Sequence, residues 1–221
     1  MDEKLFDPLD PLGMFNATTA ERIQRELLTA VCAIYGISYG DCEQFEASTL
    51  ADILPHWRRA KIEEALAELG GRLDGCSVKN EKNEAGTCSH NVLLIGDRIV
   101  LTQSKVDDRY RLPRDAAFRG TYARSPQMLF DFMNGEIPPN PDSHQALYAI
   151  MTHSPSDVAH LPLFVDIVFP DPTCKYILGR VRLMEKFPDV VQHFVPAEEV
   201  ILPEVDQKLR LKRPLADEST S

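Results

Sequence analysis

The chain has 221 residues, of which 43% are hydrophobic and 26% are charged, and its formal net charge is −10. This length allows one large domain or two small ones, and the composition predicts a folded core rather than disorder. The negative charge argues against a general nucleic-acid coat or a membrane-surface protein, because both require positive potential, although a local basic patch is compatible with it. No run of 18 apolar residues occurs and the N-terminus is acidic, so we expect a cytoplasmic protein without a membrane span or signal peptide.

The N-terminal part is expected to begin with an extended arm at residues 1–17, where two Asp-Pro pairs interrupt any periodic pattern. A helix is predicted to follow, because Thr18 and Glu21 have the spacing of a capping box and apolar residues then recur at helical intervals. This stripe consists of Ile23, Leu27, Leu28, Val31, Ile34 and Tyr35. Gly36 is the expected end of the helix, since glycine commonly occupies that position.

The stretch STLADILPHWRRAKIEEALAELGG, residues 48–71, predicts two helices separated at Pro55, because a proline biases the preceding residue away from helical geometry. Residues 92–103 predict a β-hairpin with its turn at Gly96-Asp97. Three helices followed by a hairpin have the element order of a winged-helix protein, which suggests DNA binding through a helix-turn-helix.

Two features argue against DNA recognition by this helix pair. Pro55 has a fixed φ, whereas turns of this kind commonly contain glycine. The apolar side of the second helix, with Ile62, Ala65, Leu66 and Leu69, must face the core. Its outer side then presents Glu63, Glu64 and Glu68, which would repel phosphates. We therefore expect a structural pair of helices, with DNA binding as the alternative.

The remaining sequence predicts a mixture of elements. The polar residues 76–91 predict a loop, residues 125–135 a helix that begins at Ser125-Pro126, and residues 145–151 a further helix. Residues 164–169 and 176–183 predict two strands joined by a Pro-Asp-Pro turn, and a short strand is expected within residues 190–201.

This order of elements predicts an α+β fold, with an N-terminal three-helix region and a C-terminal region built around antiparallel strands. The expected organisation is an arm at 1–17, a helical region with the hairpin at 18–104, an α+β region at 105–204 and a frayed tail at 205–221. The two central regions are compatible with a shared core.

The densest positive stretch is SKVDDRYRLPRDAAFRGTYAR, in which six Lys and Arg residues occur with three Asp residues and three aromatic residues. Arginine next to aromatic side chains suits the recognition of phosphate, nucleic acid or acidic peptide, because the guanidinium fork matches oxyanions and stacks on rings. The predicted partner-binding or anion-binding residues are Arg109, Arg111, Arg114, Arg119 and Arg124. The alternative is a surface loop of Arg–Asp pairs.

No strong motif for metal or cofactor chemistry occurs in the sequence. Cys76, Cys88 and His90 lack the Cys-x2-Cys spacing of a zinc site, and His153 is expected in a loop or on the surface. Asp166 and Asp171 offer two carboxylates for a metal-dependent hydrolase or nuclease, but the first lies within a predicted strand and the second within a predicted turn. Glycine-rich phosphate loops do not occur, so we expect no metal and no cofactor.

These observations favour a cytoplasmic, non-enzymatic binding or regulatory protein that acts through protein–protein contacts. The expected partner is a protein with an acidic or phosphorylated surface, which the arginine-rich stretch at residues 105–124 would contact. Two alternatives stay open: a winged-helix DNA-binding transcriptional regulator, and a metal-dependent hydrolase or nuclease.

Overall fold

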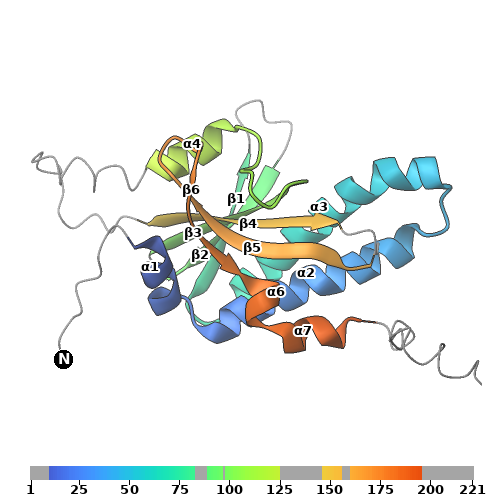
Figure 1. Ribbon diagram of the computed structural model, residues 1–221, viewed down its shortest axis with the longest axis horizontal. Helices are drawn as coiled ribbons and strands as arrows, with labels where there is room; N and C mark the ends of the chain where they lie inside the picture. The colour runs from blue at the N-terminus through green and yellow to red at the C-terminus, as the bar shows by residue number, and fades with distance from the viewer. Residues whose placement is uncertain (1–9, 83–88, 97, 125–145, 156–159, 196–221) are drawn as a thin grey trace, which may run out of the picture.

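The structure is a computed structural model that describes residues 10–82, 89–96, 98–124, 146–155 and 160–195. In these residues the chain has an α+β fold, a six-stranded mixed sheet with helices on both faces (Figure 1). The helices are α1 (Pro11–Thr18), α2 (Glu21–Cys42), α3 (Ala47–Arg72), α4 (Ala117–Arg124), α6 (Leu183–Lys186) and α7 (Pro188–His193). The strands are β1 (Cys76–Lys82), β2 (Ser89–Ile95), β3 (Ile99–Lys105), β4 (Leu147–Pro155), β5 (Pro162–Pro170) and β6 (Ile177–Arg182).

The six strands lie side by side in chain order, from β1 at one edge to β6 at the other. Neighbouring strands are antiparallel except β3 and β4, which are parallel and are connected through the segment that contains α4. Strand β3 belongs to the expected region at 18–104 and β4 to the expected region at 105–204, so a single sheet runs through both. Because β3 and β4 are parallel, their carboxyl ends lie at the same edge of the sheet.

The two faces of the sheet are covered very differently (Figure 1). Alternate residues of a strand point to opposite faces, so Leu93 and Leu101 lie on the face that packs against α2 and α3, which we call the helix face. The helix face carries the large hydrophobic core, to which α1, α6 and α7 also contribute. The opposite face, which we call the cleft face, packs against α4. Its small buried cluster consists of Val92, Val100, Ala123, Tyr148, Ile150 and Val168.

The N-terminal helices differ in detail from the prediction. Part of the expected arm is helical, because α1 begins with Pro11 and the side chain of Asp10 accepts a hydrogen bond from the backbone N–H of Gly13 at 2.8 Å. The apolar stripe of α2 is confirmed, but the helix continues past Gly36 to Cys42. A glycine inside a helix costs only about 1 kcal/mol, and the burial of Cys42 beyond it offsets that cost.

The expected break at Pro55 is wrong, because α3 is one helix of 26 residues with the proline inside it. An internal proline costs about 3 kcal/mol, and the burial of Leu54, Ile62, Leu66 and Leu69 along the same helix offsets this cost. The predicted hairpin is confirmed as β2 and β3, with Gly96 at a φ of 56°. However, β3 also pairs with β4, so the hairpin is not a free wing and the helix-turn-helix is not formed.

The later elements correct three further expectations. The polar stretch at 76–91 contains β1, which pairs along its whole length with β2. Residues 145–151 were expected to be helical, but β4 begins at Leu147 and is held between β3 and β5. The start of the expected strand at 190–201 lies in α7, whereas the two predicted strands β5 and β6 are confirmed. The predicted helix at 125–135 and the tail lie outside the described residues.

Candidate functional site

The arginine-rich segment leaves the end of β3, crosses the cleft face and enters α4. Its first arginine, Arg109, forms an ion pair inside the protein: Nε and Nη2 donate to the two carboxylate oxygens of Asp166 at 2.8 and 2.9 Å. Nη1 of Arg109 donates to Glu185 at 2.9 Å. The hydrogen bonds to Asp166 hold the pKa of this guanidinium above its usual value. Arg109 therefore fastens the segment to β5 and does not present its guanidinium to a partner.

The two aspartates that suggested a metal site lie apart and have other roles. Asp166 is fully buried on β5 and is also 3.7 Å from Nε of Arg180. Asp171 closes the turn after β5 by accepting hydrogen bonds from the backbone N–H groups of Lys175 and Tyr176, both at 2.7 Å. Among the described residues, no three His, Cys, Asp or Glu side chains are placed to hold a metal ion together.

The other arginines of the segment line three adjoining clefts. The first cleft has a volume of about 1330 Å³ and lies between α3, the ends of β1 and β3, and the segment itself. From the segment, its cations are Lys105, Arg111, Arg114 and Arg119. From α3 and β1, they are Arg59, Lys79 and Lys82. The acidic residues that line it are Glu63, Glu81, Asp107 and Asp108.

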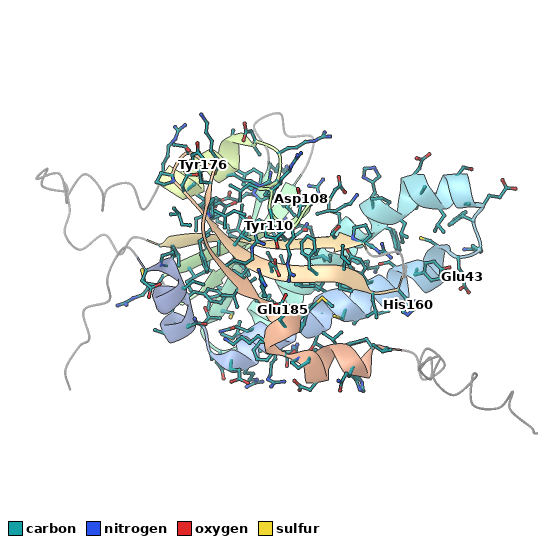
Figure 2. All side chains as sticks on the ribbon, viewed as in Figure 1. Glu43, Asp108, Tyr110, His160, Tyr176 and Glu185 are labelled. Carbon is teal, nitrogen blue, oxygen red and sulfur yellow. The ribbon has the colours of Figure 1, made fainter. Side chains whose placement is uncertain are left out.

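The second and third clefts lie behind the wall formed by residues 112–114. The second has a volume of about 1000 Å³, shares Arg111 and Arg114 with the first, and adds Lys175, Arg180 and Arg182 with Asp115 as the one acid in its lining. Two tyrosines at its rim, Tyr110 and Tyr176, are 73% and 70% exposed. Figure 2 shows Tyr176 beside α4 and Tyr110 nearer the middle of the sheet, with Glu43 at the opposite end of the molecule. The third cleft, of about 540 Å³, adds Arg124.

The clefts together concentrate positive charge on a negatively charged protein. Among the described residues, eleven of the 19 Lys and Arg residues line them, compared with five of the 19 Asp and Glu residues. Four of the five predicted site residues, Arg111, Arg114, Arg119 and Arg124, belong to this lining, whereas Arg109 does not. Such a surface attracts anions despite the overall charge of the chain.

A chain of buried polar side chains, which the sequence analysis did not find, supports the first cleft from the helix face. Glu63 on α3 accepts hydrogen bonds from the backbone N–H of Asn91 at 2.5 Å and from Nε2 of Gln103 at 2.7 Å. Oε1 of Gln103 lies 3.2 Å from Nε2 of His153, and Nδ1 of His153 lies 2.9 Å from the hydroxyl of Tyr35. The chain fixes the Glu63 carboxylate in the cleft wall.

The imidazole of His153 is neutral. Burial lowers its pKa to about 3, and the nearby charges of Arg58 and Lys105 act in the same direction. Because Nε2 of Gln103 donates to Glu63, its Oε1 is the acceptor, so Nε2 of His153 carries the hydrogen. Contrary to expectation, His153 is buried in a strand, and the alternation of β4 would have placed it inward if that strand had been predicted.

The fold and the site together define an α+β protein with adjoining cationic clefts on the cleft face of its sheet. Searches with family models, among curated proteins and among solved structures gave no match for the sequence or the fold. None of the helices in the described residues is both long and apolar enough to span a membrane.

Proposed function

We propose that this chain is a non-enzymatic binding protein that recognises an acidic or phosphorylated segment of a protein partner. The observation that carries this proposal is the concentration of eleven Lys and Arg residues around the three clefts of a chain with a net charge of −10. A surface of this kind directs an anionic segment to one region of the protein and repels it from the rest.

The wall between the clefts is the best-placed contact surface. Arg111 and Arg114 line both the first and the second cleft, and both are exposed. Among the described residues, Arg111 has one weak ion-pair partner, Asp108, whose carboxylate lies 3.4 Å from Nε at an exposed position. Its planar fork is therefore available for a carboxylate or a phosphate, which it can bind through two parallel hydrogen bonds.

The proposal is tested with two charge-reversal variants that change the net charge equally. The test variant combines Arg111→Glu with Arg114→Glu. The control combines Arg22→Glu with Arg98→Glu, because these two residues are exposed and line none of the clefts. The probes are a fluorescent peptide with three phosphoserines and its unphosphorylated form. We expect the test variant to lose at least tenfold in affinity for the phosphopeptide and the control to bind like the wild type. Equal binding by both variants would reject this surface.

A second candidate function, binding of single-stranded nucleic acid, is favoured by one observation. Tyr110 and Tyr176 stand largely exposed at the rim of the cationic second cleft, and the guanidinium of Arg180 lies 5.1 Å from the ring centre of Tyr110. Exposed aromatic rings in a positive groove are the arrangement on which unpaired bases stack, at about 1–3 kcal/mol per base.

An oligothymidine of 20 nucleotides distinguishes the two candidates. Nucleic-acid binding would appear as an affinity for this probe that falls steeply with salt and that drops on Tyr110→Ala with Tyr176→Ala. For the phosphopeptide, the same double variant should bind almost as well as the wild type, because phosphate recognition depends on the arginines. Failure to bind the oligonucleotide at low salt would remove the second candidate.

A further inference from the structure

Three nitrogen-rich side chains from three different elements line the first cleft. Arg59 lies on α3, His90 on β2 and Arg119 on α4, and all three line the cleft. Burial lowers the pKa of His90, and the charges of Arg119 and Arg59 lower it further, against the opposing influence of Glu63 and Glu81. The charge of Arg59 also adds to the effect of burial in lowering the pKa of Arg119. His90 and Arg119 also pack on the same ring, since the His90 ring and the Arg119 guanidinium lie 4.0 and 5.0 Å from the ring centre of Phe118.

Two of these side chains have unused hydrogen-bonding atoms that are buried. Nε2 of His90 and Nε of Arg119 have no hydrogen-bond partner among the described residues. The His90 side chain is 9% exposed, and its ring stacks on Phe118 at a centroid distance of 4.0 Å. A native protein rarely leaves buried polar atoms without a partner, so these two atoms indicate a group that binds between them.

The guanidinium of Arg119 has polar contacts but no carboxylate. Nη1 donates to the backbone carbonyl of Arg114 at 2.5 Å and Nη2 donates to the hydroxyl of Ser104 at 3.1 Å. No ion pair of Arg119 with an acid occurs within the described part of the chain. A half-buried cation without a counter-ion is unfavourable, and an anion next to it removes that cost.

Of the four acids that line the first cleft, the two that act on His90, Glu63 and Glu81, have other hydrogen-bond partners. Glu81 accepts from Nζ of Lys79 at 2.6 Å and from the hydroxyl of Tyr122, and these hydrogen bonds outweigh burial and lower its pKa. It lies 3.8 Å from Nε2 of His90, beyond hydrogen-bond distance. Glu63 is held by Asn91 and Gln103. Neither acid forms an ion pair with Arg119 among the described residues.

We propose that Arg59, His90 and Arg119 form a subsite that binds the phosphoryl group of the ligand. The proposal rests on the proposed function, since the phosphoryl group belongs to the phosphorylated segment that enters the first cleft. The free Nε of Arg119 and Nε2 of His90 donate to the phosphoryl oxygens, Arg59 closes the site from α3, and a dianion suits two fixed cations better than a single carboxylate does.

Phosphate binding is expected to change the pKa of His90 in a direction opposite to the effect of burial. A bound dianion stabilises the imidazolium, so the pKa of His90 must rise on binding. The charged groups that face His90, namely Arg59, Arg119, Glu63 and Glu81, are present with or without the ligand. A rise on addition of phosphate therefore reports the anion itself.

The experiment measures the pKa of His90 by NMR of its ring protons, without and with millimolar inorganic phosphate, and with chloride at the same ionic strength. We expect phosphate to raise this pKa and chloride to leave it unchanged. Arg59→Gln, at an exposed position, should weaken phosphate binding at least tenfold and Arg22→Gln should not. An unchanged pKa of His90 in saturating phosphate overturns the proposal, as does equal binding by both variants.

The two proposals fail in different ways. If phosphate raises the pKa of His90 while Arg111→Glu with Arg114→Glu leaves phosphopeptide binding intact, the subsite stands and the proposed contact surface is rejected. In the opposite case, the phosphopeptide binds, its binding depends on Arg111 and Arg114, and phosphate leaves the pKa of His90 unchanged. The subsite is then rejected and the proposed function stands. A third outcome is that a 5′-phosphorylated oligothymidine raises the pKa of His90 and the phosphopeptide does not. The phosphoryl group would then belong to a nucleic acid, and its assignment to a protein partner would be overturned.

Discussion

The helix face and the cleft face of the sheet are built from the same strands but differ in how their apolar and charged side chains are packed. On the helix face, apolar side chains such as Leu93 and Ile167 are fully buried, and the polar chain that ends at Glu63 is satisfied inside the protein. On the cleft face, one buried charge, Asp166, has its partner in Arg109, whereas Arg119 has no carboxylate partner among the described residues. The helix face thus stabilises the fold, and the cleft face combines one structural ion pair with unneutralised positive charge.

Asp166→Ala is the most severe test of this difference between the faces, because it removes the buried carboxylate to which Arg109 fastens the arginine-rich segment. Arg109 and Arg180 then lose the carboxylate between them, and breaking a buried pair from one side costs about 3–5 kcal/mol. We expect this loss in the free energy of unfolding, measured by urea denaturation. As a control, Asp107→Ala on the same segment removes an exposed carboxylate 3.1 Å from Lys105 and should cost less than about 1 kcal/mol. Equal losses would mean that Asp166 does not anchor the segment.

Two adjacent leucines of β2 measure the difference in packing directly. Leu93 is fully buried on the helix face, and Leu94 is half-buried against the small cluster on the cleft face. Leu93→Ala should lower the free energy of unfolding by about 3 kcal/mol, because a large buried side chain leaves a cavity. Leu94→Ala should lower it by about 1 kcal/mol. Similar values for the two variants would show that both faces contribute equally to the core.

The neutral His153 gives the helix face a pH dependence. Its folded-state pKa, about 3, is below the ordinary value, so the unfolded chain binds this proton more readily as the pH falls below about 6.5. Stability from this group is therefore complete above pH 6.5 and is lost towards lower pH, by at most about 1.4 kcal/mol per pH unit.

His153→Gln separates this contribution from that of the other histidines. Between pH 6.5 and 5, where most carboxylates stay ionised, the variant should lose stability less steeply than the wild type, by about one proton in the linkage slope. Urea denaturation at several pH values measures both slopes. Parallel curves for the two proteins would show that His153 titrates normally.

Local signals in the sequence were sufficient for several parts of the fold. The stripe of α2, the hairpin at Gly96 and the strands β5 and β6 follow from periodicity and turn residues. The errors arose where tertiary packing overrode a local preference. Helix α3 continues through Pro55 because Leu54 before it and Ile62 and Leu66 after it are buried in the core. Strand β4 replaces an expected helix because two neighbouring strands pair with it. Neither cause is visible in a short window of sequence.

Local sequence signals also predicted only part of the candidate site. The density of arginines and aromatic residues indicated the segment at 105–124 but could not show which arginine is occupied inside the protein. Arg109 and Arg111 are two residues apart, yet the first pairs with the buried Asp166 and the second points to solvent. Glu63 and His90 line the first cleft with Arg119, although they lie on other elements and belong to no recognisable sequence motif. Only the fold places the three residues in one cleft.

The smallest expected effect is that of Arg111→Ala on stability. Nε of Arg111 lies 3.4 Å from Asp108 at positions that are largely exposed, and an exposed pair of this kind contributes less than about 1 kcal/mol. The free energy of unfolding should therefore stay within about 0.5 kcal/mol of the wild type, while phosphopeptide affinity falls. Arg109→Ala is the positive control in the same denaturation experiment, because it leaves the buried Asp166 with Arg180 alone at 3.7 Å. If Arg111→Ala destabilises the protein as much as Arg109→Ala, then Arg111 has a structural role and its availability to a partner is disproved.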